Sequence, residues 1–507
     1  MIRRLLVCAA LFGTTAGTLA APAVARPAAA TGIRYLDPVF STTVTRDLTY
    51  GSAVNDQGKT QTLKLDLYRP AGDTATDRPA VVVVHGGAFI VGNKSNGAVW
   101  AEDLAKRGYV AVSIDYRLAT KDINSDLAAY VGAMYDAKHD AQAAVRWLRK
   151  NAATYGIDPD RIGMTGGSAG AATSLLVAFD GTDVGSSGNP GYSSAVNAVV
   201  ANSGTMGTNL QSADDAPSLM LNGTADTTVK YANAKATCDK ARAVHLWCTL
   251  VTFPGTAHTV GAYQPDLLKS MTATYFFDHL ATEPGTSAAP FPDAISFVEQ
   301  QYRDLLLRDG DPNGVDHWSS AIAHGTATPA AIVAQFAQSN EMQRSVGNVT
   351  RSFLAYLGRV PDPSGLSYWV GKIRSGKSMA WVNSALASSA EFQRRQASLT
   401  DSQFIDSLYR DLLNRAPDAG GKAHWMDKLA TGTTRASVVG SFVAQPEAIR
   451  ATAPYVAVTV GTSGLLGRAP TAAEVDEWVP KLRAGTPATD WYESVLSSSA
   501  YAARTTP

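Results

Sequence analysis

The sequence predicts a parallel α/β sheet with helices on both faces, followed by an all-α tandem-repeat region. Its first half alternates short apolar runs with longer helical stretches, which is typical of strands joined by crossover helices. The run Val81–Val84 has no polar face, so we expect a strand that is covered on both sides. The second half repeats an arginine that is followed ten residues later by a tryptophan, which indicates tandem helical units.

The elements of the first half can be predicted in chain order. The period-two run of Leu63, Leu65 and Leu67 predicts a half-exposed antiparallel strand. Residues 135–155 carry apolar side chains on one helical face and predict a helix. Further apolar runs predict buried parallel strands at residues 110–115, 161–165, 196–201, 218–221 and 246–252. Together these elements predict one α/β domain over residues 26–282.

The N-terminus has the pattern of a secretory signal peptide over residues 1–25. Arg3 and Arg4 precede an apolar run that is followed by Ala23-Val24-Ala25, an A-x-A cleavage pattern. The run is shorter than the ~20 apolar residues that span a bilayer, and no later segment is long enough, so no membrane span is expected. We therefore expect a secreted protein that is extracellular or associated with the cell surface.

The charge balance argues against a nucleic-acid partner. The chain has 507 residues with 44 basic and 44 acidic side chains, and it is 45% hydrophobic and 17% charged. This is a globular profile without the basic surface that phosphate backbones select. A small or uncharged substrate fits better.

Two cysteines remain once Cys8 is removed with the signal peptide. Cys238 and Cys248 are expected to form a disulfide in an oxidising compartment. The alternatives are two free buried thiols or a metal site, and only the isolated His245 lies near them as a further ligand.

A proline-rich segment at residues 283–293 separates the two halves and is interpreted as a linker. The arginine–tryptophan pairs after it are Arg308 and Trp318, Arg359 and Trp369, Arg415 and Trp425, and Arg468 and Trp478. The fourth copy has Glu474 where the others have glycine, so it is expected to be a divergent end unit. The predicted repeats are residues 294–345, 346–398, 399–454 and 455–507.

The segment Gly166-Gly167-Ser168-Ala169-Gly170 follows an apolar strand and precedes a helical stretch. A serine on such a tight strand-to-helix turn is held in strained backbone geometry, with its hydroxyl exposed at the carboxyl edge of the sheet. Ser168 is therefore the candidate nucleophile. The plainer interpretation is a helix N-cap serine in a glycine-rich turn.

A second glycine-rich turn, His85-Gly86-Gly87-Ala88-Phe89, follows the Val81–Val84 strand. Its backbone N–H groups can point at a developing oxyanion. The candidate oxyanion hole comprises Gly86, Gly87 and Ala88, together with the N–H of Ala169. A phosphate loop or a dinucleotide loop is a poor alternative, because neither the Walker spacing nor a G-x-G-x-x-G is present.

A serine nucleophile needs a base, and the base needs an acid that orients it. In the chain order Ser, Asp, His, the acid follows a late strand and the histidine follows the last one. Asp226 and His258 lie at these places. The rival acids are Asp214 and Asp215, which precede the strand.

Residues 40–281 resemble the secreted esterase branch of the α/β-hydrolase superfamily, in the hormone-sensitive-lipase-like and acetyl or feruloyl esterase group. The resemblance depends on these motifs: His85-Gly86-Gly87-Ala88-Phe89, Ile114-Asp115-Tyr116-Arg117-Leu118, Asp158-Pro159-Asp160-Arg161-Ile162, the Ser168 turn, Asn222-Gly223-Thr224-Ala225-Asp226 and Pro254-Gly255-Thr256-Ala257-His258. One departure is Ala88, where the family usually has a third glycine. A second is the short stretch between Ser168 and Asp226, which leaves little room for a large cap.

The C-terminal repeats resemble a bacterial repeat family of unassigned function that is found on secreted and surface proteins. Asp309, Asp311, Asn313 and Gly314 resemble the start of a calcium loop, but Ser320 stands where the last ligand would be, so no metal is expected. The tryptophans are expected to fill the repeat cores, with sugar stacking as the alternative.

These observations predict a secreted serine carboxylesterase that hydrolyses short- or medium-acyl esters through an acyl-enzyme on Ser168, without a cofactor. The substrate would be a small-molecule or polymer-linked ester, and the repeats would contact a cell surface or a polysaccharide. Two alternatives remain: an exopeptidase or amidase that uses the same triad, and a surface-binding protein with an inactive hydrolase half.

Overall fold

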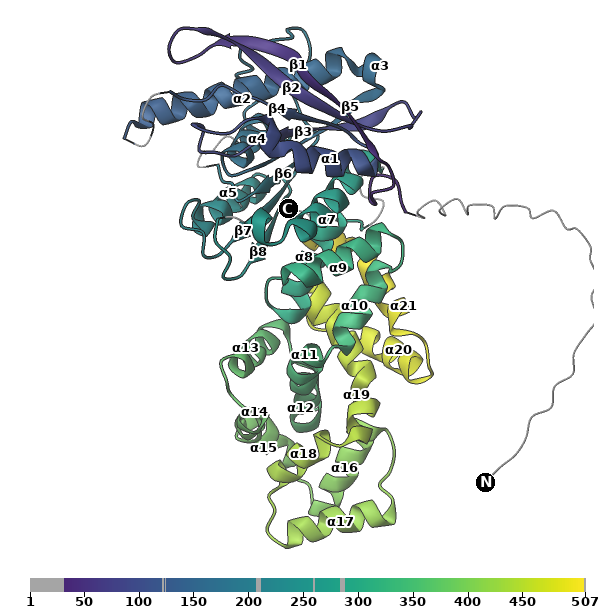
Figure 1. Ribbon diagram of the computed structural model, residues 1–507. Helices are drawn as coiled ribbons and strands as arrows, with labels where there is room; N and C mark the ends of the chain where they lie inside the picture. Colours follow the sequence, from purple (N-terminus) through teal and green to yellow (C-terminus); the bar gives the residue numbers. More distant parts are fainter. Residues whose placement is uncertain are drawn as a thin grey trace, which may run out of the picture.

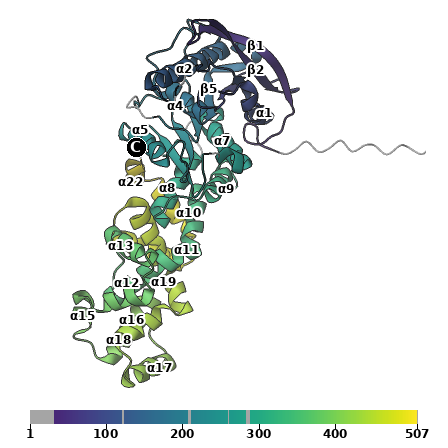
Figure 2. The same ribbon diagram turned by 60° about the vertical axis from the view of Figure 1, so that its left-hand side comes forward.

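The computed structural model of the protein describes residues 32–120, 123, 125–206, 211–258, 260–282 and 288–505. The predicted signal peptide, 1–25, lies outside these residues, as does the first part of the predicted linker. An N-terminal domain, residues 32–282, is followed by a helical repeat region, residues 288–505, that extends away from it (Figures 1 and 2).

An eight-stranded mixed sheet forms the centre of the N-terminal domain, in the order β1-β2-β4-β3-β5-β6-β7-β8. β2 pairs antiparallel with both β1 and β4, and the other pairs are parallel. The antiparallel strand predicted at Leu63–Leu67 and the buried parallel strands are therefore confirmed. The strands are β1 (Thr42–Val54), β2 (Thr60–Pro70), β3 (Arg78–Val84), β4 (Val110–Ile114), β5 (Ile157–Gly167), β6 (Ala198–Asn202), β7 (Ser218–Gly223) and β8 (Cys248–Phe253).

Helices cover both faces of this sheet, and the two faces have separate cores. Val81 of β3 shares one core with Leu268, whereas its neighbour Val82 shares the other with Leu175. Successive side chains of a strand point to opposite faces, so a strand without a polar face fits between two helical layers. The helices are η1 (Lys94–Gly97), α1 (Ala98–Arg107), α2 (Leu127–Lys150), α3 (Ala152–Tyr155), α4 (Ala169–Phe179), α5 (Tyr231–Ala243), α6 (Val260–Tyr263), α7 (Pro265–Phe276) and η2 (Phe277–Ala281).

The helix predicted at residues 135–155 begins earlier, at Leu127. The carboxylate of Asp126 accepts hydrogen bonds from the N–H groups of Ala128 and Ala129, which satisfies two donors of the first turn. The cap therefore starts the helix about two turns before the predicted residue 135.

A disulfide joins Cys238 of α5 to Cys248 of β8 across a Cα–Cα distance of 5.3 Å. It closes a loop between positions ten residues apart. In the chain-entropy account such a loop stabilises the fold by roughly 2–3 kcal/mol. The predicted pairing is therefore present, and it holds α5 against the edge strand of the sheet.

The described part of the predicted linker is a packed corner. Ala288 and Phe291 are buried, and the ring of Phe291 lies 5.8 Å from that of Trp247 and 6.2 Å from that of Tyr501, between ring centroids. The core beneath α1 and α7 continues without a break into the repeat region. Residues 288–293 of the predicted linker are thus packed between the two parts of the chain, because their apolar side chains fill this corner.

The repeat region is helical throughout its described length. None of the helices described, here or in the N-terminal domain, is long and apolar enough to cross a membrane. The helices are α8 (Ala294–Leu306), α9 (Pro312–Ala323), α10 (Pro329–Gln338), α11 (Asn340–Met342), η3 (Gln343–Gly347), α12 (Asn348–Leu357), α13 (Pro363–Arg374), α14 (Met379–Ala387), α15 (Ala390–Gln396), α16 (Asp401–Leu413), α17 (Ala419–Ala430), α18 (Arg435–Val443), α19 (Pro446–Thr459), η4 (Val460–Leu466), α20 (Ala472–Arg483), α21 (Ala488–Leu496) and α22 (Ser499–Thr505).

The repeated tryptophans are partly buried and pack against the core, as expected. The ring of each tryptophan lies near an aromatic ring of the next helix along the chain. The ring pairs, with centroid distances, are Trp318–Phe336 at 6.0 Å, Trp369–Trp381 at 5.9 Å, Trp425–Phe442 at 5.8 Å and Trp478–Trp491 at 5.0 Å.

The repeated arginines join the first and last helices of their own repeats by ion pairs. The first three pair with Glu341, Glu391 and Glu447 respectively. In the fourth copy Arg468 pairs instead with Glu474, which also completes a capping box with Thr471. The divergent glutamate therefore supplies locally the carboxylate that the other copies take from a later helix.

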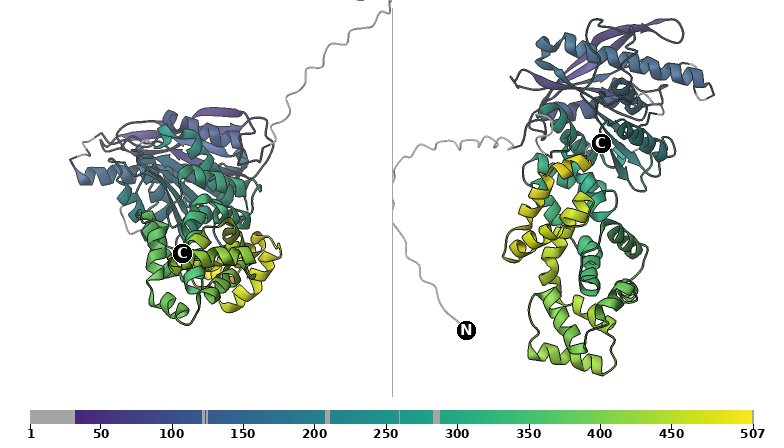
Figure 3. Two further views of the ribbon diagram at one scale, coloured as in Figure 1. Left: turned by 90° about the horizontal axis from the view of Figure 1, so that it is seen from below. Right: turned by 180° about the vertical axis from the view of Figure 1, so that it is seen from behind.

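The repeats do not continue as an open stack. Arg395 at the end of repeat 2 pairs with Asp411 of repeat 3 at 2.6 Å, and Arg504 at the end of repeat 4 pairs with Asp304 of repeat 1, also at 2.6 Å. These are the same two positions of the repeat, so the contact between repeats 2 and 3 recurs between repeats 4 and 1. Figure 3 shows the C-terminal helices, in yellow, beside the helices that open the region.

Glu299 on α8 is a buried carboxyl group whose ion pair with Arg303 is long, at 3.4 Å. It is 1% exposed, its Oε2 accepts only long hydrogen bonds of 3.4 Å from Arg303 and from the N–H of Gly310, and burial raises its pKa to about 7. The corresponding carboxylate of repeat 3, Asp406, is paired with Lys422, and repeat 1 has Val315 at that lysine position. Ionising Glu299 is therefore costly.

We expect Glu299→Gln to stabilise the protein at pH 8 by roughly 2–3 kcal/mol and to have little effect at pH 5. The pKa of Glu299 in the folded state lies above its unfolded value, so the stability of the folded protein falls as pH rises through 7. Glutamine does not ionise, so the variant does not lose this stability. Thermal melts at the two pH values measure this difference. The exposed Glu477→Gln is the control, and an equal shift at both pH values would contradict the prediction.

Candidate active site

Ser168 lies at the turn between β5 and α4, with φ 55° and ψ −117°. A non-glycine residue adopts this left-handed conformation only where the surrounding structure enforces it. Here strand and helix approach so closely that a Cβ on Gly170 would lie 2.1 Å from the carbonyl oxygen of Val84. The glycines beside Ser168 thus permit the turn that exposes its hydroxyl.

Ser168, His258 and Asp226 form a chain of hydrogen bonds. His258 Nε2 lies 2.8 Å from Ser168 Oγ, and His258 Nδ1 lies 2.8 Å from Asp226 Oδ2. A carboxylate only accepts, so Nδ1 carries the proton and Nε2 is free to accept from the serine hydroxyl. The structure therefore brings together all three residues predicted from the order of the strands.

Asp226 is held by its own loop after β7. Its Oδ1 accepts hydrogen bonds from the N–H groups of Thr228 and Val229, at 2.9 and 2.8 Å, and its side chain is buried. The rival Asp215 caps the loop before β7 by accepting from Ser212 N, and Asp214 is exposed beside it. The acid beside His258 is thus Asp226.

The loop after β3 lies against the serine. A Cβ on Gly86 would lie 3.4 Å from Ser168 Cβ and 2.8 Å from the carbonyl oxygen of Gly167. Among the hydrogen bonds of the described residues, none uses the N–H of Gly87, Ala88 or Ala169. These donors of the predicted oxyanion hole are therefore available to a ligand.

Ala88, which replaces the third glycine of the family pattern, has φ 51°, and the following Phe89 has φ 63°. Ala88 is exposed and Phe89 is buried, in edge contact with Tyr116 and Tyr130. The anchored phenylalanine holds the loop in a left-handed conformation that alanine alone would not favour.

Comparison with known proteins agrees with this geometry. Residues 65–212 match the family described as BD-FAE. A probable isoprenylcysteine alpha-carbonyl methylesterase of Oryza sativa subsp. japonica is 36% identical over 132 residues, covering 26% of this chain and 27% of that protein. Esterase LipQ of Mycobacterium tuberculosis is 33% identical over 160 residues, covering 31% of this chain and 34% of that protein. The N-terminal domain is an α/β hydrolase related to esterases.

The chain spans only about a quarter to a third of the length of these relatives. Among solved structures, a truncated carbohydrate esterase from gut microbiota is 21% identical with a TM-score of 0.41, covering 48% of this chain and 99% of that one. In the second half, residues 289–346, 349–395 and 383–452 match a domain of unknown function, DUF4214. The repeat family expected from the sequence is therefore present, and its matches end before the fourth predicted repeat.

His85 and Tyr116, which were not predicted as site residues, support the loop after β3. Their rings are stacked at 4.3 Å, and His85 Nδ1 donates to the carbonyl oxygen of Gly86 at 2.7 Å. Burial lowers the pKa of His85, so the ring is held neutral and this N–H bond fixes the path of the loop. The signal in the sequence is that His85 directly follows β3 and that Tyr116 lies two residues after the end of β4.

Asn202 is a further residue of the hydrolase site that was missed. Its carbonyl oxygen accepts the N–H of Ser168 at 2.9 Å. It is the last residue of β6, and its neighbour in the sheet is Gly167, directly before the serine. The adjacency of β5 and β6 would have identified it. Within the described ranges, no group of three His, Cys, Asp or Glu residues could hold a metal ion.

Proposed function

We propose that this protein is a serine carboxylesterase that hydrolyses short- or medium-acyl esters through an acyl-enzyme on Ser168. The observation that carries the proposal is the continuous hydrogen-bond chain from Ser168 through His258 to Asp226, beside unused backbone donors. In this arrangement a carboxylate orients a histidine that is placed to take the proton of a serine, which is the geometry of a nucleophile and its base. The family matches to esterases support the same reaction.

In the first step His258 Nε2 takes the proton from Ser168 Oγ as the oxygen attacks the ester carbonyl carbon. The negative charge that develops on the carbonyl oxygen is stabilised by the N–H groups of Gly87, Ala88 and Ala169, each worth about 2.7–4 kcal/mol in acyl transfer. When the tetrahedral intermediate collapses, the C–O bond to the alcohol breaks and His258 returns its proton to the leaving alkoxide.

In the second step water replaces the alcohol. His258 removes a proton from water, which attacks the acyl carbon, and Ser168 leaves with that proton as the free carboxylic acid forms. Asp226 keeps Nδ1 protonated and stabilises the imidazolium in both steps. One ester and one water thus give one acid and one alcohol.

A panel of p-nitrophenyl esters and aminoacyl p-nitroanilides tests the reaction class. We expect turnover of the esters and at least a hundredfold lower kcat/KM for the anilides. Preference for the anilides would indicate the exopeptidase or amidase alternative. No turnover of either class by the folded protein would indicate an inactive hydrolase half.

We further propose that the protein is exported, which the signal-peptide pattern and the disulfide between Cys238 and Cys248 both support. N-terminal sequencing of protein recovered from the culture medium should begin at Arg26. Recovery of the chain only inside cells, with residues 1–25 still attached, would contradict export.

The repeats are proposed to contact a polysaccharide through Tyr368 and Trp381. These side chains are 53% and 38% exposed, and both rings lie against Trp369. The matching positions of the other repeats have no exposed aromatic pair: Ala331, Ser437 and Asp490 correspond to Trp381, and His317, His424 and Glu477 to Tyr368. Paired exposed rings are suited to stacking on pyranose faces.

We expect the combined change Tyr368→Ala and Trp381→Ala to weaken binding to insoluble xylan or chitin at least tenfold, because the stacking surface is removed. Sedimentation assays measure the bound fraction, while hydrolysis of p-nitrophenyl acetate should stay within twofold of the parent. Tyr192→Ala, an exposed tyrosine of the N-terminal domain, is the control. Unchanged sedimentation of the double variant, or no binding by the parent, would exclude this surface.

A further inference from the structure

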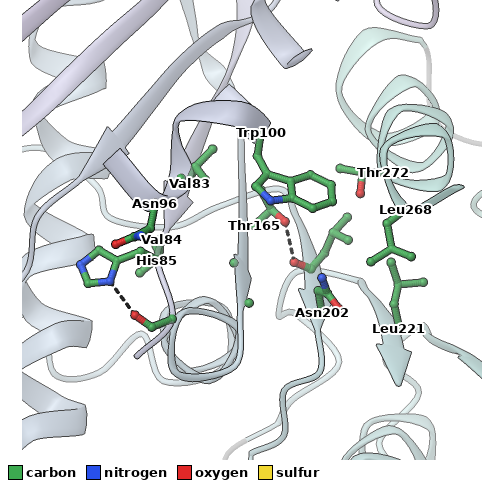
Figure 4. Close-up of a pocket in the computed structure, with 15 residues that line it drawn as sticks. Val83, Val84, His85, Asn96, Trp100, Thr165, Asn202, Leu221, Leu268 and Thr272 are labelled. Carbon is green, nitrogen blue, oxygen red and sulfur yellow. Dashed lines mark hydrogen bonds between the residues drawn. The ribbon is translucent and has the colours of Figure 1, made fainter. Parts of the chain in front are cut away.

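A cavity of about 110 Å³ lies between the sheet and the helices α1 and α7. Figure 4 shows the indole of Trp100, from α1, reaching across it toward Leu268 of α7, with Leu221 and Asn202 at the strand ends below. The side chains of Val200, Leu221 and Leu268 make most of the wall apolar. The cavity is therefore suited to an aliphatic group.

The cavity adjoins the catalytic residues on two sides. Gly86 and Gly167 line it, and they are the residues whose backbone touches the Ser168 turn. Gly261 lies three residues after His258, and a Cβ there would be 2.6 Å from Asn202 Nδ2 and 3.5 Å from Trp100 Cζ2. The loop that carries the base thus covers the same space, and the backbones of Gly86 and Gly167 place the cavity next to the Ser168 turn.

We propose that this cavity binds the acyl chain of the substrate and that Trp100 limits its length, which makes the enzyme selective for acyl groups of two to four carbons. The inference rests on the proposed esterase function. The size of the cavity supports this limit: an apolar protein cavity of about 150 Å³ accommodates a ring of six carbons, so one of about 110 Å³ accommodates roughly four. A longer acyl chain would collide with the indole of Trp100.

The acyl chain fits this cavity better than the alcohol does. The acyl group stays bonded to Ser168 between the two steps, whereas the alcohol must leave before water can attack. The cavity is enclosed by α1, α7 and the sheet, which suits the acyl group, because this group stays bound between the two steps. On the outer side of the oxyanion loop, Ile90 and Val91 are exposed, which leaves an open apolar surface for a departing alcohol.

Two substrate series in the full chain test the assignment. The first varies the acyl chain at a constant leaving group: p-nitrophenyl acetate, butyrate, octanoate and decanoate. The second varies the alcohol at a constant acyl group: methyl, butyl and octyl acetate. We expect the parent to prefer acetate and butyrate by at least tenfold over octanoate in kcat/KM.

In Trp100→Ala the ratio of kcat/KM for octanoate to that for butyrate should rise at least tenfold, with no change beyond twofold across the alcohol series. Trp100→Phe keeps a smaller ring in place and should give an intermediate ratio, so it tests the idea if the alanine variant is unstable. Trp247→Ala, which removes an indole at the packed corner far from the triad, is the matched control.

An acyl ratio within twofold of the parent in both Trp100 variants would overturn the proposal. So would a shift confined to the alcohol series, which would assign the cavity to the leaving group. If the parent hydrolyses esters and its activity needs Ser168, these outcomes remove only the acyl-site assignment. If the parent hydrolyses no ester, the proposed function fails together with it.

Discussion

Replacing Ser168 with alanine is expected to lower kcat for p-nitrophenyl butyrate by a factor on the order of 10⁶, because the members of a catalytic triad act as a unit. The change removes the one oxygen that His258 Nε2 contacts in the triad and leaves the buried part of the turn in place. Steady-state kinetics measure the loss, and the melting temperature should stay within a few degrees of the parent.

A serine of the same helix provides the control. Ser174 is buried on α4 and donates a hydrogen bond to the carbonyl oxygen of Gly170 at 2.8 Å, so Ser174→Ala removes a hydroxyl close to the site without touching the triad. It should keep kcat within about threefold of the parent. Ester turnover by Ser168→Ala within tenfold of the parent would refute the assignment of the nucleophile.

Asp226→Asn should lower kcat by a factor on the order of 10⁴. An asparagine can present its NH₂ group to Nδ1, which stabilises the tautomer with the proton on Nε2 and leaves no acceptor for the serine proton. The measurement is kcat/KM across pH 6–9, where the loss should persist because the tautomer, rather than the charge of the ring, is wrong.

Asp215→Asn is the matched variant, since this carboxylate lies in the loop before the same strand and makes its contact with Ser212. We expect its kcat/KM to remain within about threefold of the parent. A large loss in Asp215→Asn together with a small one in Asp226→Asn would reverse the choice of acid.

The triad could be predicted because each member depends on local sequence and on one rule of topology. Ser168 is marked by glycines that only a tight turn requires, and Asp226 and His258 each follow the end of a buried strand. Parallel strands that start at one edge end at the other, so residues just after them meet at that edge. Short motifs at the ends of three strands were therefore enough to predict the three residues of the triad.

The support around the site was harder to predict, because it depends on which strands are neighbours. The hydrogen bond from Ser168 N to Asn202 O requires β6 beside β5, and the stacking of His85 on Tyr116 requires β4 beside β3. The hydrophobic pattern of the sequence does not predict which strands are neighbours in the sheet. The sequence shows that strands exist and leaves their order to packing.

The packing of the predicted linker over residues 288–293 could not be predicted, for a related reason. Its prolines and small residues have the composition of a loop, whereas the burial of Phe291 depends on Tyr501, which lies at the other end of the repeat region. The closing ion pair between Asp304 and Arg504 likewise joins positions 200 residues apart. The composition of a short segment cannot predict contacts with residues so far away in the sequence.

The ion pair between Asp304 and Arg504 implies that the closed arrangement needs an even number of repeats. Each predicted unit of two repeats offers one aspartate near its start, Asp304 in the first unit and Asp411 in the second, two repeats later. It also offers one arginine at its end, Arg395 in the first unit and Arg504 in the second. With four repeats every such pair is used and the chain returns to the hydrolase. Adding or deleting a single repeat would leave one carboxylate and one guanidinium at an unmatched face, so growth of this region by duplication would conserve the closed bundle only in steps of two.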